Sequence, residues 1–367
     1  MQKTGASRSV KIAAFLFSAA LFIGAAVALD MMIARLAPTG VNEADPKLGW
    51  RMKKNITYTR EKTTFAGRKY QVTLATDEHG TRTYGANRNA PVKILVFGDS
   101  FTGEPYASND QMWYAALVRQ LAALTGRPAD DFYVVAAGSG GYGTLQNLLL
   151  AEEVKTFYQP TILIHQFCDN DFSNNSFEME QKSVVLNQWM QRPYLARDRE
   201  TIIWHEGALA RLYRAMLFRS ALFGVFDRAL QVSLSNHYGG YLMISNRDGD
   251  AYLKALRAAT YDPEAIDLTG FLLGKLRQAF DSVPAVLVDC PIEPTSSNRI
   301  WVDIARRAGF TPATTPSDML LEAKRRGELD LFATDGAHLS ETGNELMGAL
   351  LAKEMLSLGM ISNGAIR

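Results

Sequence analysis

The chain has 367 residues, 47% of them hydrophobic, and its 39 Lys and Arg residues nearly balance 38 Asp and Glu residues, which leaves a net charge of +1. This composition is typical of a globular protein and excludes a disordered or fibrous chain. Nucleic-acid-binding proteins normally carry a strongly basic domain or stripe, so the charge gives no reason to expect nucleic acid as a partner.

The N-terminal segment is predicted to enter a membrane. Residues 12–29 form an apolar run that basic residues precede, and about 18 apolar residues are near the minimum that spans a bilayer. We therefore expect residues 1–35 to be a transmembrane anchor or an uncleaved signal. By the positive-inside rule the chain would be a single-pass protein of the bacterial inner membrane, with its bulk in the periplasm. The alternative is secretion after signal cleavage, because Ala26-Val27-Ala28 resembles a cleavage site.

Residues 36–90 are predicted to form an accessory, β-rich extension. The sequence Leu-Gly-Trp-Arg at 48–51 opens it, and two stretches of polar and apolar alternation follow at residues 56–60 and 69–77. Ala66-Gly67 separates these stretches. The pattern predicts two short strands of a hairpin.

Residues 91–360 are predicted to form an α/β domain. Apolar runs typical of strands buried on both faces alternate with segments of helical periodicity, which indicates a central parallel sheet. The predicted strands are 92–97, 132–137, 161–167 and 285–290, and the predicted helices are 112–124, 145–157, 268–280 and 341–358.

A helical insert is expected at about 173–260. Within it, residues 208–226 mix arginines with large apolar side chains at helical spacing. We favour a helix that packs on the core with its arginines in solvent. The alternatives are a cap over the functional site and a helix that lies on a membrane surface.

The two cysteines, Cys168 and Cys290, allow at most one disulfide. A chain of this size does not need a disulfide to hold its core, and free cysteine usually behaves as a small hydrophobic residue. We therefore interpret both as semi-buried thiols. Neither lies at metal-ligand spacing from another cysteine or a histidine.

Three predicted strands end in segments suited to chemistry, and in open α/β sheets functional groups gather at the carboxyl ends of strands. FGDSFTG at 97–103 places Ser100 where a base can reach its hydroxyl. AAGSGGYGT at 136–144 brings backbone N–H groups close to a ligand, as an oxyanion hole requires. A phosphate cradle is the competing interpretation, but the Lys-Ser/Thr ending of a P-loop is missing.

The third strand ends in FCDNDF at 167–172, where the Asn170 amide could donate to an oxyanion. The alternatives are a polar turn, which Asp and Asn favour, and a metal site at Asp169 and Asp171, for which the sequence offers no partner cluster. A fourth segment, DGAHLSETGN at 335–344, places Asp335 three residues before His338. This spacing lets a carboxylate orient an imidazole that takes a proton from a serine.

The other histidines, which are His79, His165, His205 and His237, are interpreted as structural.

Together these blocks resemble the SGNH subgroup of the GDSL esterase and lipase family, in order and spacing, along about 92–358. The resemblance implies a three-layer, flavodoxin-like SGNH hydrolase fold and the following roles for residues of this chain. Ser100 would be the nucleophile, Asp335 and His338 the acid and base, and Ser100, Gly141 and Asn170 the oxyanion donors. Gly140 is a neighbouring candidate for the glycine donor.

One residue departs from the family's pattern. The third block usually reads Gly-x-Asn-Asp, and Cys168 stands here in place of the Gly. The ordinary α/β-hydrolase elbow is the structural competitor, but it requires Gly-x-Ser-x-Gly, and position 102 is Thr. The extension with its Leu-Gly-Trp-Arg segment resembles that of membrane-anchored members of the family.

The function implied is that of a serine ester hydrolase. It would remove an acyl group, acetyl first among the candidates, from an envelope-associated or carbohydrate ester through an acyl-serine intermediate, without a metal or organic cofactor. One alternative is an O-acetyltransferase that acts on periplasmic polysaccharide. The other is a catalytically silent module that binds glycan. The expected partners are the acyl ester and, through the N-terminal helix, the membrane.

Overall fold

The computed structural model describes residues 8–36, 40–103, 105–182, 192–205, 208–226, 229, 262–292 and 299–361. Much of the predicted insert at 173–260, with His237 in it, lies outside the described residues.

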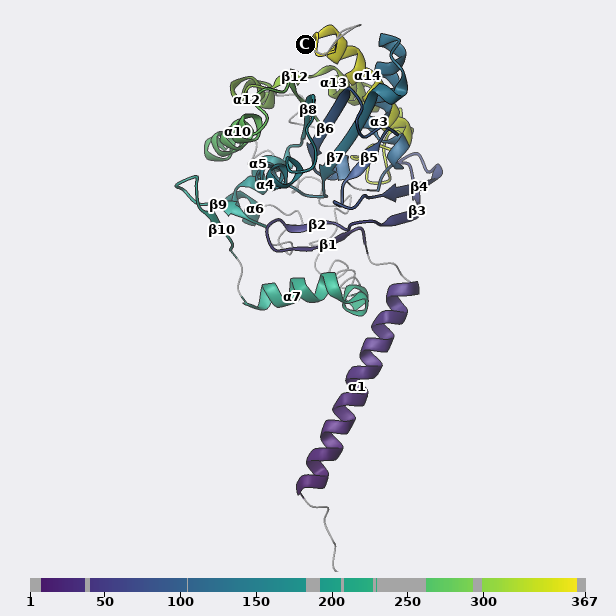
Figure 1. Ribbon diagram of the computed structural model, residues 1–367, viewed down its shortest axis with the longest axis vertical. Coiled ribbons are helices and arrows are strands. Elements are labelled where there is room, and N and C mark those ends of the chain that lie inside the picture. Colours follow the sequence, from purple (N-terminus) through teal and green to yellow (C-terminus); the bar gives the residue numbers. More distant parts are fainter. Residues whose placement is uncertain are drawn as a thin grey trace, which may run out of the picture.

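A six-stranded sheet forms the centre of the folded body, in the order β12-β11-β8-β6-β7-β5 (Figure 1). Five strands are parallel, and β5 pairs antiparallel with β7 at one edge. Counted along the chain, the parallel strands lie in the order 2-1-3-4-5, which is the flavodoxin-like arrangement. The predicted fold class is therefore confirmed. The strands are β5 (Arg82–Tyr84), β6 (Val92–Gly98), β7 (Phe132–Gly138), β8 (Ile162–Phe167), β11 (Ala285–Asp289) and β12 (Thr311–Ala313).

Helices cover both faces of this sheet, and alternation along β6 divides the core between them. Ile94 and Val96 pack with α3 (Trp113–Thr125), α13 (Thr315–Arg325) and α14 (Glu341–Ser357). Leu95 and Phe97 pack with α4 (Thr144–Val154), α10 (Pro263–Gln278) and α12 (Ile300–Ala308). Successive side chains of a strand point to opposite faces, so a run that is apolar at every position can build two cores.

Local sequence signals fix where the later helices begin. Asp262 accepts the N–H of Ala265 at 2.9 Å and precedes Pro263, the first residue of α10. Ser340 caps α14 through the N–H of Gly343. Side-chain oxygens at this position satisfy N–H groups that have no partner within the helix. Both caps therefore define the residue at which the helix begins.

Two hairpins precede the sheet. Strands β3 (Thr57–Thr63) and β4 (Lys69–Ala75) pair antiparallel, which confirms the predicted hairpin. A shorter hairpin joins β1 (Asn42–Asp45) and β2 (Gly49–Met52). Both lie on the side of the sheet at which α4 and α5 (Asn170–Asn175) begin (Figure 1).

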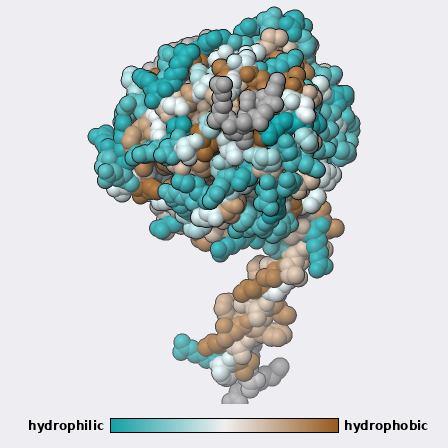
Figure 2. All heavy atoms as spheres, turned by 45° about the horizontal axis from the view of Figure 1, so that its top comes forward, coloured by the Kyte–Doolittle hydropathy of each residue, from teal (hydrophilic) through white to brown (hydrophobic). Residues whose placement is uncertain are grey.

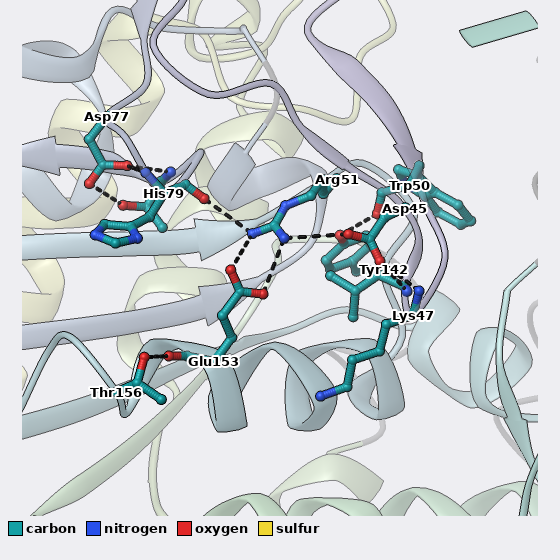
Figure 3. A network of polar contacts seen from close by, with 11 residues as sticks. Asp45, Lys47, Trp50, Arg51, Asp77, His79, Tyr142, Glu153 and Thr156 are labelled. Carbon is teal, nitrogen blue, oxygen red and sulfur yellow. Dashed lines mark hydrogen bonds and ion pairs between the residues drawn. The ribbon is translucent and has the colours of Figure 1, made fainter. Parts of the chain in front are cut away.

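Arg51 ties the shorter hairpin to the main body (Figure 3). Its guanidinium donates to the Glu153 carboxylate on α4 at 2.9 and 3.1 Å, to the carbonyl of His79 at 3.1 Å and to Asp45 at 3.4 Å. The Arg51 side chain is 14% exposed. Burial opposes its charge, but the bond and charge of Glu153 raise its pKa above the ordinary value. The hairpin is therefore held by an ion pair partly removed from solvent.

The N-terminal helix α1 (Arg8–Leu36) stands apart from the folded body (Figure 1). Its 29 residues have a mean hydropathy of 2.5 in the most apolar window, none of that window is buried, and the helix is long and apolar enough to cross a membrane. Figure 2 shows it as an apolar rod below a largely hydrophilic body. By length and composition, a signal sequence would match equally well.

The described parts of the insert form short elements. They are α6 (Phe177–Lys182), β9 (Tyr194–Leu195), β10 (Ile202–Ile203) and α7 (Ala208–Arg219). The predicted helix within 208–226 is confirmed by α7. The prediction that this helix packs on the core does not hold for two of its leucines, because Leu209 is 82% exposed and Leu212 is 57% exposed.

The interpretation of the cysteines as thiols is wrong. Cys168 and Cys290 form a disulfide, with their Cα atoms 5.3 Å apart. The two residues directly follow β8 and β11, which are neighbours in the sheet. Sequence spacing could not reveal this, since 122 residues separate the cysteines.

Candidate active site

Ser100 lies where the strand order reverses. It is the first residue of α2 (Ser100–Gly103), which directly follows β6, and β7 and β8 flank β6 on its two sides. In doubly wound sheets, ligands bind outside the carboxyl ends of the strands at such a reversal.

Glycines let the backbone segments meet closely at this point. Gly98 and Gly138 lie opposite each other in β6 and β7, and a Cβ on Gly138 would come within 2.4 Å of the Gly98 carbonyl oxygen. A Cβ on Gly103 would lie 2.4 Å from the Gly138 carbonyl oxygen and 3.0 Å from Cα of Ser139. The short helix that carries Ser100 therefore packs directly on the glycine-rich turn after β7.

Ser100, His338 and Asp335 form a continuous hydrogen-bonded chain. The distance from His338 Nε2 to Ser100 Oγ is 2.7 Å, and the distance from His338 Nδ1 to Asp335 Oδ2 is also 2.7 Å. Residues 238 positions apart in the sequence thus meet at one point. With Nδ1–H donated to the carboxylate, Nε2 is free to accept a proton from the hydroxyl.

Backbone groups hold the Asp335 carboxylate. Its Oδ1 atom accepts the N–H groups of Ala337 and His338 at 2.9 and 3.0 Å. Burial alone would raise the pKa of Asp335, but the bonds from His338 and from these N–H groups outweigh burial and lower it. Asp335 is therefore ionised at neutral pH.

Aromatic rings hold the His338 imidazole. Tyr106 stacks on it with a centroid distance of 4.1 Å and an interplanar angle of 8°, and Phe101 lies at 4.7 Å. The Tyr106 hydroxyl also donates to Asp335 at 3.0 Å. Lys62 of β3 lies over the Tyr106 ring at 4.5 Å, so the extension reaches the site. Sequence reasoning missed Tyr106 because no motif marks a tyrosine six positions after the serine.

The structure describes all three residues that the sequence predicts as oxyanion donors. As the first residue of α2, Ser100 has no acceptor for its N–H within the helix. The N–H of Gly141 has no hydrogen-bond acceptor among the residues that the structure describes. Asn170 is the first residue of α5, and its side chain lies close enough to the buried Asp99 carboxyl to lower the pKa of that carboxyl.

Asp99 is the second residue whose importance the motifs did not indicate. It accepts the N–H of Phe101 at 3.0 Å. Burial raises its pKa, and the bonds from Phe101, Asn170 and Gln166 together with the charge of His338 offset part of this rise. Asp99 therefore lies next to both the turn that carries Ser100 and the Asn170 side chain, which belong to different sequence blocks.

Asp171 is held by two hydrogen bonds at the end of the third block. Its Oδ2 atom accepts the N–H of Cys168 at 3.0 Å, and its Oδ1 atom accepts the hydroxyl of Thr144 on α4 at 2.8 Å. Burial raises the pKa of Asp171 to about 8. Among the described residues, no group of three or more His, Cys, Asp or Glu side chains could hold a metal ion.

The other described histidines lie away from the Ser100–His338–Asp335 chain. His165 is fully buried within β8, and burial lowers its pKa to about 3, so it is neutral. His79 stacks on Phe157, and His205 stacks on Phe177, each at 3.6 Å.

Two features of the site go together. Ser100 lies where the strand order reverses, and the Asp-x-x-His segment lies before the last helix. The parallel strands have the flavodoxin-like order, and this arrangement agrees with the SGNH-type hydrolase fold that the sequence resemblance implies.

Several solved structures are similar to this chain at low identity. A lipase/acylhydrolase from Enterococcus faecalis is 13% identical, with 73% of this chain and 96% of that chain covered and a TM-score of 0.39. A family 3 carbohydrate esterase from Clostridium thermocellum is 12% identical, with 73% and 96% covered and a TM-score of 0.36. A GDSL-like lipase from Parabacteroides merdae is 15% identical, with 76% and 100% covered and a TM-score of 0.35. No protein-family model and no curated protein match the sequence.

Proposed function

We propose that this protein is a serine ester hydrolase that works through an acyl-Ser100 intermediate. The observation that carries the proposal is the hydrogen-bonded chain from Ser100 Oγ through both nitrogens of His338 to Asp335. A hydroxyl is a weak nucleophile unless an adjacent base takes its proton, and a base oriented by a carboxylate meets that need.

In the proposed reaction, Ser100 Oγ attacks the ester carbonyl while His338 Nε2 takes the hydroxyl proton. The tetrahedral intermediate collapses, its bond to the alcohol oxygen breaks, and His338 returns the proton to the leaving alcohol. Water then attacks the acyl-serine with the same base and releases the acid. The negative charge of Asp335 stabilises the imidazolium at both stages.

The oxyanion that forms in both steps would be held by the N–H groups of Ser100 and Gly141 and by the Asn170 amide. Donors held in place before the reaction need little reorganisation when charge develops, which makes this stabilisation large. The Asn170 side chain lowers the pKa of the nearby Asp99 carboxyl, which supports a role for this amide as a donor to negative charge.

We further propose that α1 is a retained anchor and that the body lies in the periplasm. The basic residues before the apolar run favour this orientation. The disulfide of Cys168 and Cys290 supports it independently, because disulfides persist in oxidising compartments such as the periplasm. A body in this position has access to envelope material, so we propose an acetyl ester of envelope-associated carbohydrate as the substrate.

The test is release of p-nitrophenol from p-nitrophenyl acetate by the full chain in detergent, with Ser100→Ala and His338→Ala beside it. Release that disappears in both variants, with unchanged circular dichroism, is the expected result. Equal release by the Ser100→Ala variant would refute the proposal. Acetyl that accumulates on an added oligosaccharide would indicate transfer instead of hydrolysis.

A further inference from the structure

The glycine-rich turn after β7 has a defined geometry. The N–H of Tyr142 donates to the carbonyl of Ser139 at 3.0 Å, and Gly141 has a φ of 74° while Gly140 does not have a positive φ. These features describe a type II β-turn with Gly141 at its third position. The orientation of the Gly141 N–H is therefore the orientation of the central peptide, between Gly140 and Gly141.

Trp50, which lies on β2 of the shorter hairpin, holds that peptide. Its indole Nε1–H donates to the Gly140 carbonyl at 3.1 Å. In a planar trans peptide, the C=O and N–H groups point in opposite directions. A bond that fixes the Gly140 carbonyl toward Trp50 therefore fixes the Gly141 N–H on the side away from Trp50.

This turn needs an outside partner to keep its conformation. Rotation of the central peptide converts a type II turn into type I and reverses the N–H. With glycine at both central positions, no Cβ opposes the rotation. The following carbonyl, of Gly141, is held by Asn174 at 3.1 Å and by Arg192 at 2.6 Å, but neither bond fixes the central peptide.

Trp50 is itself placed rigidly. It is fully buried, the Arg192 guanidinium lies 5.1 Å from its ring centroid, and the Tyr142 hydroxyl donates to its carbonyl at 2.5 Å. The neighbouring Arg51 anchors the same strand to α4 through Glu153, as Figure 3 shows. The strand that carries the indole is thus held by Tyr142 at Trp50 and by Glu153 at Arg51.

We propose that Trp50 is a positioning residue that orients the Gly141 N–H toward the oxyanion, so that the accessory hairpin β1–β2 completes the active site. The inference rests on the proposed ester hydrolysis. It assigns a use to the extension, which carries no residue of the Ser100–His338–Asp335 chain.

The test compares Trp50→Phe with Trp301→Phe in the full chain. Both variants lose an indole N–H from a buried position, but Trp301 Nε1 has no hydrogen-bond partner among the described residues. Loss of one oxyanion donor costs about 10²- to 10³-fold in kcat. We expect a fall of roughly ten- to a hundredfold for Trp50→Phe, since the donor is misoriented and not removed. KM should stay within twofold, and Trp301→Phe should match the unaltered chain.

A second readout separates positioning from loss of fold. A boronic acid that forms a tetrahedral adduct on serine should bind Trp50→Phe more weakly by the factor by which kcat/KM falls. If that variant unfolds, benzothienylalanine at position 50 keeps the bicyclic ring and lacks only the N–H, and it should show the same defect. Equal kcat in the two Phe variants, or unchanged inhibitor affinity, would overturn the inference. An unaltered chain that neither hydrolyses the ester nor binds the inhibitor would instead refute the proposed function.

A separate observation concerns α7, which lies across the end of the body from which α1 extends (Figure 1). Both the hydroxyl of Ser220, directly after α7, and the N–H of Leu222 donate to Asp30 Oδ1 at 2.8 Å. Asp30 is the first charged residue after the apolar run of α1. These bonds hold the end of α7 at the level where the anchor would leave the bilayer.

One side of α7 is apolar and has no cover among the described residues. Leu209, Leu212 and Met216, at positions i, i+3 and i+7, are 82%, 57% and 40% exposed. Arg211 and Arg219 are exposed on the same helix. An apolar face flanked by arginines, tied to a membrane anchor, is typical of a helix in the surface of an anionic bilayer.

We infer that α7 rests on the lipid surface and sets the position of the body above the membrane. This inference rests on the proposed anchor. The test uses the full chain in nanodiscs of phosphatidylcholine and phosphatidylglycerol, with one thiol-reactive fluorophore at Leu212→Cys and lipids that carry a quencher near the headgroup. Because both native cysteines form the disulfide, the introduced thiol is the only free one.

Met319→Cys on α13 is the matched control, since Met319 is 43% exposed and α13 lies at the far end of the body (Figure 1). Phe22→Cys in α1, with a quencher deep in the chains, reports on the anchor itself. We expect strong quenching at 212 and none at 319. Quenching at 22 without quenching at 212 would overturn the inference, and a second copy of the chain would then be sought on α7 by cross-linking. No quenching at 22 would refute the anchor.

Discussion

At the scale of single residues, the site depends on how completely the His338 ring is fixed. One nitrogen faces Ser100 and the other faces Asp335, while Tyr106 and Phe101 stack on the ring. The imidazole therefore has one tautomer and one orientation available for proton transfer. The contribution of each neighbour can be separated by substitution.

Asp335→Asn should lower kcat for the acetyl ester on the order of 10³- to 10⁴-fold, because the amide no longer selects the required tautomer or stabilises the imidazolium. Tyr106→Phe keeps the stacked ring and loses only the 3.0 Å bond to Asp335, so we expect less than about a tenfold fall. Steady-state kinetics of both variants measure this. Equal losses in the two variants would contradict the role given to the carboxylate.

Asp171 should make stability depend on pH. Its pKa is about 8 in the folded chain against an ordinary value of 3.8, so between these values the folded chain binds a proton that the unfolded chain releases. The free energy of unfolding should then fall as pH rises through this window, by up to about 1.4 kcal/mol per pH unit.

Asp171→Asn mimics the protonated carboxyl, since its amide can bond to Thr144 while its oxygen accepts the N–H of Cys168. Urea unfolding between pH 5 and pH 8 should show a shallower fall of the unfolding free energy in this variant. The control Asp130→Asn, at an exposed position, should leave the pH profile unchanged. Parallel profiles for Asp171→Asn and the unaltered chain would show that Asp171 is ionised in the folded state.

At the scale of elements, the disulfide is the main constraint that local patterns did not reveal. It ties Cys168, two residues before Asn170, to the end of β11 and closes a loop of 122 residues. Restricting an unfolded chain in this way stabilises the folded state by about 2–5 kcal/mol. The Cys168→Ala/Cys290→Ala variant should lose that much in urea unfolding, and dithiothreitol should produce a similar loss only in the unaltered chain. Labelling of both cysteines by iodoacetamide without reductant would contradict this.

The sequence predicted the strands and helices whose apolar pattern extends over several residues. Runs such as 92–97 and 132–137 are apolar at every position because β6 and β7 are buried on both faces, and both strands occur within one residue of the expected bounds. Strand β12, with three residues and a proline, carries no such signal, and β5 pairs only at an edge. The blocks around Ser100 and His338 were recognisable from residue type and spacing. Tyr106, Asp99 and Trp50 reach the site through tertiary contacts that no local pattern records.

At the scale of the whole molecule, the main feature is the position of the candidate site relative to α1. The helices α4 and α5 begin on the side of the sheet from which α1 extends, so the carboxyl ends of β7 and β8 lie on that side (Figure 1). The candidate site is therefore on the side of the body nearer to α1. An anchored enzyme of this form would act on esters close to the membrane surface.

With α1 retained as proposed, the full chain should remain in the membrane pellet after extraction with alkaline carbonate, because this helix of 29 residues is long and apolar enough to cross a bilayer. A protease added to spheroplasts should digest the body and leave a small anchored fragment. Release of a shortened chain into the periplasmic fraction would show that the segment is cleaved as a signal.

The central claim is that Ser100 carries the acyl group, and the most direct measurement is mass spectrometry of the chain quenched with acid during turnover of p-nitrophenyl acetate. We expect the added mass of one acetyl group on the peptide that contains Ser100, and no such peptide from the Ser100→Ala variant. Turnover that depends on His338 with no acetyl on Ser100 at any time, or acetyl on another residue that disappears at the rate of turnover, would contradict the claim.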